Sequence, residues 1–315
     1  MTISVVIPNF NGENLLRKNL SHLISILEKH KEGTCEIIIT DDASKDASVE
    51  YVQDYIKKNH SPVSLLLLEN NSGKNKGFSG NVNKGVAKAS GDILILLNTD
   101  VVPRKDFLFP LLQHFSDKKV FAVGCMDESI ENEKVVLRGR GVGKWRKGFL
   151  IHGPGELDKK TTLWVSCGSG AFKKEIWDKI GGLNELYNPF YWEDIDLSYR
   201  AQKAGYTVVF EKESVVRHEH DRGSIKKNYT PFSVTKIAYR NQFYFTWLNA
   251  TDKMILLSHY IFVPYFLLKA LFKGNMGMIY GFFLAVGHLG KVLQERQRIQ
   301  RMVVESDREV IKRSS

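Results

Sequence analysis

The first 125 residues alternate between strand-like and helix-like segments, and this alternation limits the fold more than any other feature. The strand-like segments are short apolar runs, whereas the helix-like segments have apolar residues at helical spacing. In chain order they are strand 3–8, helix 13–30, strand 36–40, helix 47–58, strand 63–68, helix 77–89 and strand 92–97. This order predicts an α/β fold with a mixed, mostly parallel sheet and helices on both faces.

The middle of the chain is less regular. Residues 138–148 combine glycines with cations and predict a loop. Such a loop either moves over an anionic ligand or is simply solvated, and the sequence does not decide between the two. Further along, the same criteria predict strands over 163–172, 208–210 and 215–216 and helices over 175–180 and 194–204.

The last 65 residues differ in character. Residues 254–272 are nearly all apolar, and 276–287 form a second apolar run. A membrane-spanning helix needs about 20 apolar residues, and Pro264 and Lys269 inside the first run favour an interfacial or re-entrant segment. A buried helical pair, an oligomer interface and a transmembrane hairpin remain alternatives. We therefore expect an α/β domain over residues 1–225 and a helical, membrane-associating region over 226–315.

Charge indicates the kind of partner. The chain has a net charge of +10, and ten Lys or Arg face five Asp or Glu after residue 249. A basic C-terminal tail from Lys291 would contact anionic headgroups. Nucleic acid is disfavoured as a partner because no nucleic-acid motif is present. The three cysteines have no metal-type spacing and predict buried thiols in a reducing compartment, and a chain that opens on a strand predicts no signal peptide.

Polar residues follow three of the predicted strands. They are Pro8–Asn11, Asp41–Asp42 and Asn98–Asp100. Ligands bind at the carboxyl ends of the strands in such sheets. An aspartate at this edge can hold a divalent cation between two phosphates, or it can cap a turn. Asp41 and Asp42 are open to the same two interpretations, as a ligand acceptor or as Asx-turn residues.

Two further segments are candidates for ligand contact. Residues 77–83 open a helix whose N–H groups could face a ligand, although they match neither a dinucleotide fingerprint nor a P-loop. His218 and His220 follow a short strand. A single histidine is more often structural, but here an imidazole could complete a metal site begun by Asp100.

An acidic pair stands at a predicted helix start. Glu193 and Asp194 follow four aromatic residues, and a carboxylate held beside apolar rings can serve as a general base. Core packing is one interpretation of the aromatic residues. They are Tyr187, Phe190, Tyr191 and Trp192.

Taken together, these motifs resemble an inverting family 2 glycosyltransferase with the GT-A fold. The resemblance spans about residues 3–225 in the family's order and is nearest to the bacterial rhamnosyl- and galactofuranosyl-transferase-like branch. The matching segments are Val5–Asn11, Asp41–Ser44, Asn75–Phe78 with Asn83, Leu96–Asp100, Gly168–Ala171, Gly181–Glu185, Trp192–Leu197, Arg200 and Gly205–Tyr206.

The resemblance implies roles for individual residues. Asp194 matches the catalytic base, with Glu193 in support. Asp100 matches the metal-binding aspartate of the DXD motif, and His218, 24 positions after Asp194, matches an additional ligand of Mn²⁺ or Mg²⁺, with His220 as a substitute. The acceptor would contact Tyr191 and Trp192. Residues implied at the nucleotide sugar are Pro8, Asn9, Asn11, Asp41, Asp42, Gly77, Asn83 and Thr99.

The implied activity is transfer of a sugar, with a rhamnose-like sugar as one candidate, from a nucleotide-diphosphate sugar to a hydroxyl group. The expected acceptor is a lipid-linked or cell-surface glycan at the cytoplasmic face of the cell membrane. The C-terminal helices could also serve a homo-oligomer. The alternative function is a non-catalytic nucleotide-sugar-binding subunit of a glycan-assembly complex.

Overall fold

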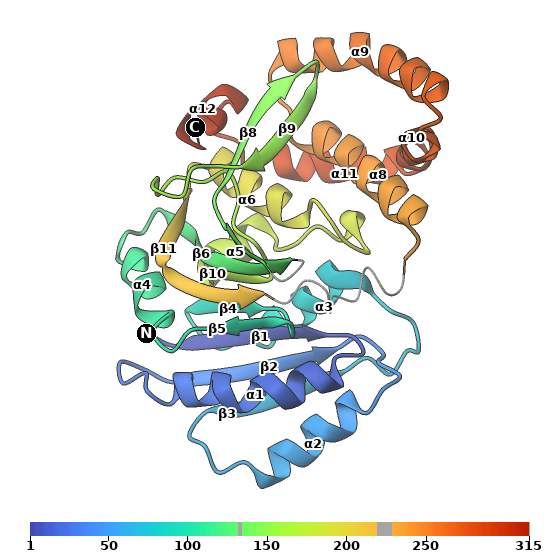
Figure 1. The fold of residues 1–315 in the computed structure, drawn as a ribbon. Coiled ribbons are helices and arrows are strands. Elements are labelled where there is room, and N and C mark those ends of the chain that lie inside the picture. Colours follow the sequence, from blue (N-terminus) through green and yellow to red (C-terminus); the bar gives the residue numbers. More distant parts are fainter. Residues whose placement is uncertain (132–133, 219–228, 315) are drawn as a thin grey trace.

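The computed structural model describes residues 1–131, 134–218 and 229–314 (Figure 1). Within them a nine-stranded sheet has the order β3-β2-β1-β4-β10-β6-β11-β5, with β7 paired to β6. The first four strands along this order are parallel, and β10 enters antiparallel to both of its neighbours. The predicted mixed, mostly parallel sheet is confirmed. Its strands are β1 Ile3–Asn9, β2 Cys35–Asp41, β3 Ser64–Glu69, β4 Ile93–Leu97, β5 Val101–Pro103, β6 Val120–Glu131, β7 Lys134–Arg138, β10 Ser169–Lys173 and β11 Thr207–His218.

Helices cover both faces of the sheet, also as predicted. One apolar core contains the inward residues of α1 Glu13–Leu27, α2 Ser48–Lys58 and α4 Leu108–Leu112. The opposite core contains those of α3 Gly77–Val86, α5 Lys174–Ile180 and α6 Glu193–Lys203. The strands β1 and β4 are buried along almost their whole length because each lies between two such layers.

Two segments of the middle region differ from expectation. Residues 138–148 were predicted as a loop, but β8 Gly141–Arg146 and β9 Phe149–Pro154 form an antiparallel hairpin there. The turn between them uses Lys147 and Gly148, both with left-handed φ. The strand predicted over 163–172 is shorter, since β10 begins only at Ser169. The two short strands predicted near residues 208 and 216 are one bulged strand, β11.

The C-terminal helices form a layer beyond α6, where α9 lies at the edge of the molecule and the β8–β9 hairpin reaches it from the sheet (Figure 1). The backbone of Gly148 touches His259 of α9, and the Gly148 carbonyl lies 2.9 Å from the His259 Nδ1 atom. A third core joins this layer to the hairpin and to α6. Its helices are α8 Pro231–Asn249, α9 Lys253–Phe272, α10 Met276–Gly287, α11 Leu289–Gln300 and α12 Asp307–Ser314.

The predicted basic tail folds as α11 and α12 and packs on the α/β part. Asp307 at the start of α12 lies 3.1 Å from the Lys203 Nζ atom and accepts a hydrogen bond of 2.7 Å from the Tyr199 hydroxyl group. Arg296 donates to three backbone carbonyls, and Arg298 pairs with a glutamate at 2.5 Å. Arg296 and Arg298 therefore make contacts within the protein. The expectation of a basic tail that contacts headgroups did not include these contacts.

One described helix, α9, is long and apolar enough to cross a membrane, and only 17% of its most apolar 18-residue window is buried. The helices α10 and α11 pass the same test only as a pair bent by 70°. The predicted division at residue 225 falls in 219–228, outside the described residues, and stays a prediction.

Candidate functional site

The ends of β1 and β2 meet through side-chain hydrogen bonds. Asn9 donates to the Asp41 carboxylate over 2.8 Å, and Ser44 donates its backbone N–H to the other Asp41 oxygen over 2.9 Å. The Asn11 side chain accepts from the Lys45 N–H over 2.7 Å. Asn9 is buried, and its Oδ1 atom has no hydrogen-bond partner. The parallel register that pairs Pro8 with Thr40 places these groups at one edge of the sheet.

Asp42 joins this edge to the start of α3. Its carboxylate accepts from the Asn70 amide at 2.9 Å, from the Lys76 N–H at 2.8 Å and from the Gly77 N–H at 3.0 Å. The next N–H groups of α3 donate to the Pro189 carbonyl and the Asn188 side chain. The first N–H groups of α3 are thus already paired within the protein. These three donors lie 28, 34 and 35 positions after Asp42, so the contacts are not those of an Asx turn, and nucleotide contact at Asp42 and Gly77 stays a prediction.

The other two residues implied at the nucleotide sugar lie in different surroundings. Thr99 packs against Gly12 at the end of β1, and its carbonyl accepts from Asn19, so it belongs to the same edge. Asn83 lies further along α3, where its amide donates to the Leu183 carbonyl over 2.8 Å and its oxygen accepts from the Leu183 N–H over 3.0 Å. Asn83 therefore fixes the loop after α5.

His218 stands between two carboxylates. Its Nε2 atom lies 3.4 Å from Asp100, and its Nδ1 atom lies 3.0 Å from Asp127. Burial lowers its pKa, but hydrogen bonds to Asp100 and Asp127 outweigh burial and raise the pKa to about 9. The register of β11 explains the meeting, because His218 pairs with Val101 on one side and Ser129 on the other.

The predicted metal pair, Asp100 and His218, is thus brought together. One nitrogen and carboxylate oxygens suit Mn²⁺ or Mg²⁺, which also takes substrate phosphates as ligands. Across 1–131, 134–218 and 229–314 no group of three His, Cys, Asp or Glu side chains is arranged to hold a metal ion. His220 lies outside the described residues. Asp127 was missed, because only the pairing of β6 with β11 brings it to His218.

The acidic pair begins α6. Glu193 is buried and its Oε2 atom has no hydrogen-bond partner among the described residues, while Asp194 keeps some exposure and accepts from the Ile195 N–H over 2.8 Å. Neither carboxylate forms an ion pair in the described part of the chain. Burial raises the pKa of both groups, and the Asp194 charge raises that of Glu193 further. A carboxylate with a raised pKa and no cationic partner suits proton abstraction near neutral pH.

A short segment connects the acidic pair with the metal pair. The Asn98 N–H donates to the Gly168 carbonyl over 2.9 Å, which places residues 166–168 beside the end of β4. Burial, and then the charges of Asp194 and Glu193, raise the pKa of the neighbouring Cys167 thiol well above its usual value. Asn98 and the acidic pair therefore both lie close to residues 167–168.

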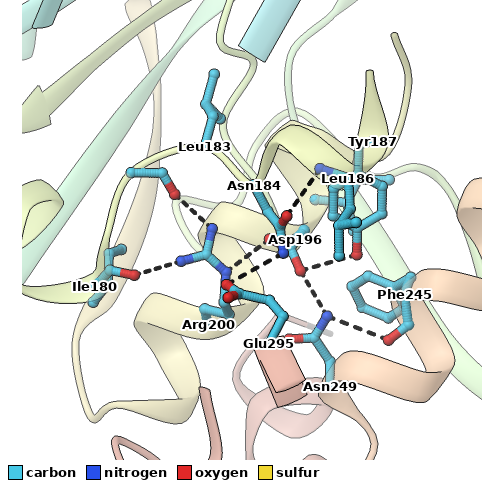
Figure 2. Close-up of polar contacts among 12 residues, drawn as sticks. Ile180, Leu183, Asn184, Leu186, Tyr187, Asp196, Arg200, Phe245, Asn249 and Glu295 are labelled. Atoms are coloured by element: carbon cyan, nitrogen blue, oxygen red, sulfur yellow. Dashed lines mark hydrogen bonds and ion pairs between the residues drawn. The ribbon is translucent and has the colours of Figure 1, made fainter. Parts of the chain in front are cut away.

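Asp196, two positions after Asp194, has the opposite surroundings. It accepts from Arg200 over 2.7 Å, from the Tyr187 hydroxyl over 3.0 Å and from the Asn249 amide over 2.7 Å. Arg200 also donates to the carbonyls of Ile180 and Gly182, each over 2.7 Å. Figure 2 shows this network, in which every charge has a partner. We call Asp196 and Arg200 the buried ion pair.

The aromatic residues before the acidic pair divide into core and surface. Tyr187, Phe190 and Trp192 are buried, and the Trp192 ring packs 5.1 Å from that of Phe245. Tyr191 is 42% exposed. Of the two residues predicted at the acceptor, Tyr191 has a free ring surface and Trp192 packs in the core. The acceptor contacts themselves stay a prediction.

The sheet order and the strand-end carboxylates define the class of protein: the chain has the GT-A fold of glycosyltransferases. Residues 4–181, more than half of the chain, match Glycosyl transferase family 2, and the chain belongs to that family. The solved structure of GalNAc-T7 with UDP, GalNAc and Mn²⁺ is similar, with a TM-score of 0.64, 17% identity, and coverage of 80% of this chain and 48% of that one.

Two curated relatives are similar in sequence. The O-antigen chain rhamnosyltransferase RfbN of Salmonella typhimurium is 26% identical over 73% of this chain and 68% of its own length. The GalNAc(5)-diNAcBac-PP-undecaprenol beta-1,3-glucosyltransferase of Campylobacter jejuni is 29% identical over 59% of this chain and 56% of its own length. The chain spans less than half the length of several other curated relatives.

Proposed function

We propose that this chain is an inverting glycosyltransferase that uses a nucleotide-diphosphate sugar, with Asp194 as general base. The observation that supports this most directly is the acidic pair, which is held at a helix start without a cation and beside the segment next to Asn98. Family membership supports the activity class. A rhamnose-like sugar is one candidate donor, in keeping with the similarity to RfbN.

The reaction is a single displacement. The acceptor hydroxyl oxygen forms a bond to the anomeric carbon on the face opposite the leaving group, the bond from that carbon to the diphosphate oxygen breaks, and the hydroxyl proton passes to Asp194. The electron pair of the broken bond leaves with the nucleotide diphosphate. Because there is one displacement, the anomeric configuration inverts. Burial and then the Asp194 charge raise the pKa of Glu193 to about 8, so at neutral pH Glu193 keeps its proton and the negative charge stays on Asp194.

Asp100 and His218 would hold the divalent cation, Mn²⁺ or Mg²⁺, while the residues at the ends of β1 and β2 bind the nucleotide. When bound, the cation neutralises charge that develops on the leaving diphosphate. Asp127 fixes the orientation of the His218 ring from the side away from Asp100. The Mn²⁺ and UDP named with GalNAc-T7 support this assignment.

The proposed acceptor is a lipid-linked or cell-surface glycan at the cytoplasmic face of the membrane. The printed names of the Campylobacter and Salmonella relatives support it. The outer faces of α9 and α10 also support it, because they expose many large apolar side chains. Among them are Met254, Leu257, Tyr260, Ile261, Leu268, Leu271, Phe272, Tyr280 and Phe283. Lys147 and Lys269 lie over the Tyr265 ring in this region, where they would contact anionic headgroups.

The activity is tested with a panel of UDP-, dTDP- and GDP-sugars in Mn²⁺ or Mg²⁺. Binding is measured by calorimetry, and transfer is then measured to a saccharide on undecaprenyl diphosphate in vesicles. We expect one donor to bind in a metal-dependent way and the product to show the inverted anomer by NMR. Binding without transfer to any acceptor would favour the non-catalytic subunit. Turnover unaffected by a chelator would contradict the metal assignment.

Membrane association is tested by flotation with vesicles that contain anionic lipid. The double variant I261E/L268E places two charges on the outer face of α9 and should abolish flotation. The matched control is F109E, because Phe109 is 72% exposed on α4, on another side of the molecule. If I261E/L268E floats as well as the unaltered protein, the membrane proposal fails. A change from oligomer to monomer in the same variant would instead favour the homo-oligomer.

A further inference from the structure

The residues before the acidic pair, 187–192, form what we call the base loop, and its backbone is strained. Tyr191 and Trp192 have φ angles of 73° and 78°, in the left-handed region that side chains other than glycine rarely adopt. Trp192 is also the N-cap residue of α6, and its side chain makes no capping hydrogen bond. Two strained residues in succession persist only where the surroundings fix them.

Helix α8 supplies those surroundings through one buried amide. The Asn241 Nδ2 atom lies 2.8 Å from the Tyr187 carbonyl oxygen and 2.9 Å from each of the carbonyl oxygens of Phe190 and Tyr191. Asn241 is fully buried. A single donor group therefore contacts three carbonyls of the base loop, including that of one of the two strained residues.

The orientation of the Asn241 amide is itself fixed. Its oxygen accepts from the Arg240 Nε atom over 2.9 Å, so the nitrogen must face the loop. Arg240 additionally donates from its guanidinium to the Asn188 carbonyl. On the far side of the loop, the Asn188 side chain donates to the Lys76 carbonyl over 2.7 Å and accepts from the Ser79 N–H. The base loop is thereby fixed between α8 and the start of α3.

We propose that Asn241, oriented by Arg240, is a positioning residue for the general base: it holds the base loop in the strained backbone that aims the first turn of α6. This inference rests on the proposed function. Asn241 contacts the backbone of the loop and not the reacting groups. It affects the reaction because the loop backbone determines where the side chains of Glu193 and Asp194 point. Misplacement of a reacting group by about 1 Å can reduce a rate by about a hundredfold.

The test uses the full-length chain and the variant N241L, which roughly keeps the size of the side chain and adds no charge, but has no N–H group to donate to the three carbonyls. We expect kcat to fall about 10- to 100-fold while the dissociation constant of the donor changes less than about twofold. Amide hydrogen exchange over residues 187–192 should accelerate. The acidic limb of the kcat–pH profile should move to lower pH, because the released carboxylates gain water.

The pH readout depends on which charged groups surround the pair. Besides each other, Glu193 and Asp194 face titratable or charged groups from the loop, from α6 and from the segment before β10. These groups are Tyr187, Tyr191, Asp196, Arg200 and Cys167. None of them is on α8 and N241L adds no charge, so N241L changes the limb only by moving the pair.

Two further variants keep the outcome decisive. T246V on α8 removes a buried hydroxyl whose hydrogen bond stays within the helix, so kcat and the pH limb should not change. R240Q, at a half-buried position, should shift both quantities in the direction of N241L but by less, and it replaces N241L if that variant does not fold. Loss of kcat with an unmoved limb and normal exchange would overturn the proposal. If the unaltered chain transfers no sugar, the proposed function has failed instead.

Discussion

Helix α6 begins with three carboxylates within four positions, and their surroundings differ. Asp196 is buried with Arg200, Tyr187 and Asn249 around it, whereas the acidic pair has no cationic partner in the described chain. Glu193 and Asp196 are both almost inaccessible to water. Burial alone therefore does not tell a structural carboxylate from a catalytic one. The partners do, because they determine whether the charge is neutralised in place or stays available to a substrate.

The difference follows from the groups that each carboxylate contacts. Asp196 and Arg200 are four residues apart and lie on the same face, where Arg200 also reaches the carbonyls of Ile180 and Gly182. Glu193 lies seven positions before Arg200 and so shares that face, but it forms no ion pair in the described chain, and with Asp194 it lies near Cys167. The first turn of α6 thus contains one carboxylate with a buried cation and, among the described residues, two without one.

The largest effect should come from D194N. Loss of the base should reduce kcat about 10²- to 10⁴-fold, while the dissociation constant of the donor stays the same, because the amide has the same size but cannot take a proton. Calorimetry and a transfer assay measure the two quantities. Turnover at the normal rate would show that Asp194 is not the base, and the contrast within α6 would disappear.

D196N should act on stability rather than on chemistry. It leaves the Arg200 guanidinium buried without its carboxylate, which we expect to cost about 3–5 kcal/mol of unfolding free energy. Chemical denaturation measures this, and transfer per folded molecule should stay within about tenfold of normal. A loss below about 1 kcal/mol would mean that the network in Figure 2 is not a structural anchor.

E193Q should stabilise the protein in a pH-dependent way. Burial, then the Asp194 charge, raise the pKa of Glu193 in the folded state, so the unaltered protein loses stability as pH rises from about 4 towards that raised pKa. Glutamine avoids this loss. We expect E193Q to be about 1–3 kcal/mol more stable at pH 8 and equal at pH 4, in denaturation curves at both values. Equal stability of E193Q and the unaltered protein at both pH values would mean that ionisation of Glu193 does not destabilise the folded state.

The smallest effect is in the pH profile of the unaltered enzyme. Burial raises the pKa of Asp194, and a base must be ionised, so kcat should fall by at most about tenfold per unit as pH drops through that raised pKa. The midpoint should lie clearly above the ordinary aspartate value of about 4. In E193Q the midpoint should stay close to that of the unaltered enzyme, because Glu193 has the higher pKa and is already protonated where Asp194 titrates. A midpoint at pH 4 or below would mean that the catalytic base is a solvated carboxylate and not the buried Asp194.

The alternation of apolar runs predicted the sheet and its helices because each strand lies between two apolar layers, as β4 does. It also located the strand-end residues, since parallel strands end at one edge. What it missed depends on contacts between distant segments. Residues 141–154 form a hairpin because they pack on α9 more than a hundred positions later. Glycines and cations in that stretch resemble a solvated loop when the partner is unknown.

In the site, too, the sequence predicted local features and missed contacts between distant segments. His218 was found by its spacing from Asp194, and the meeting with Asp100 agrees, but Asp127 enters only through the register of β6 with β11. The pairing of Asp196 with Arg200 is local, yet the hydrogen bond from Asn249 is not. Asn241 has no local signal, since an asparagine inside a helix gives no indication of the three carbonyls it contacts.

The contact between Lys203 and Asp307 has a consequence for synthesis of the chain. These residues are 104 positions apart, so α6 is translated long before α12. Until Asp307 emerges, the ammonium group of Lys203 and the hydroxyl of Tyr199 lack the carboxylate that both bind in the finished protein. A premature stop codon ahead of position 307 would thus release an unfinished chain, a substrate for chaperones and proteases, in place of a smaller enzyme.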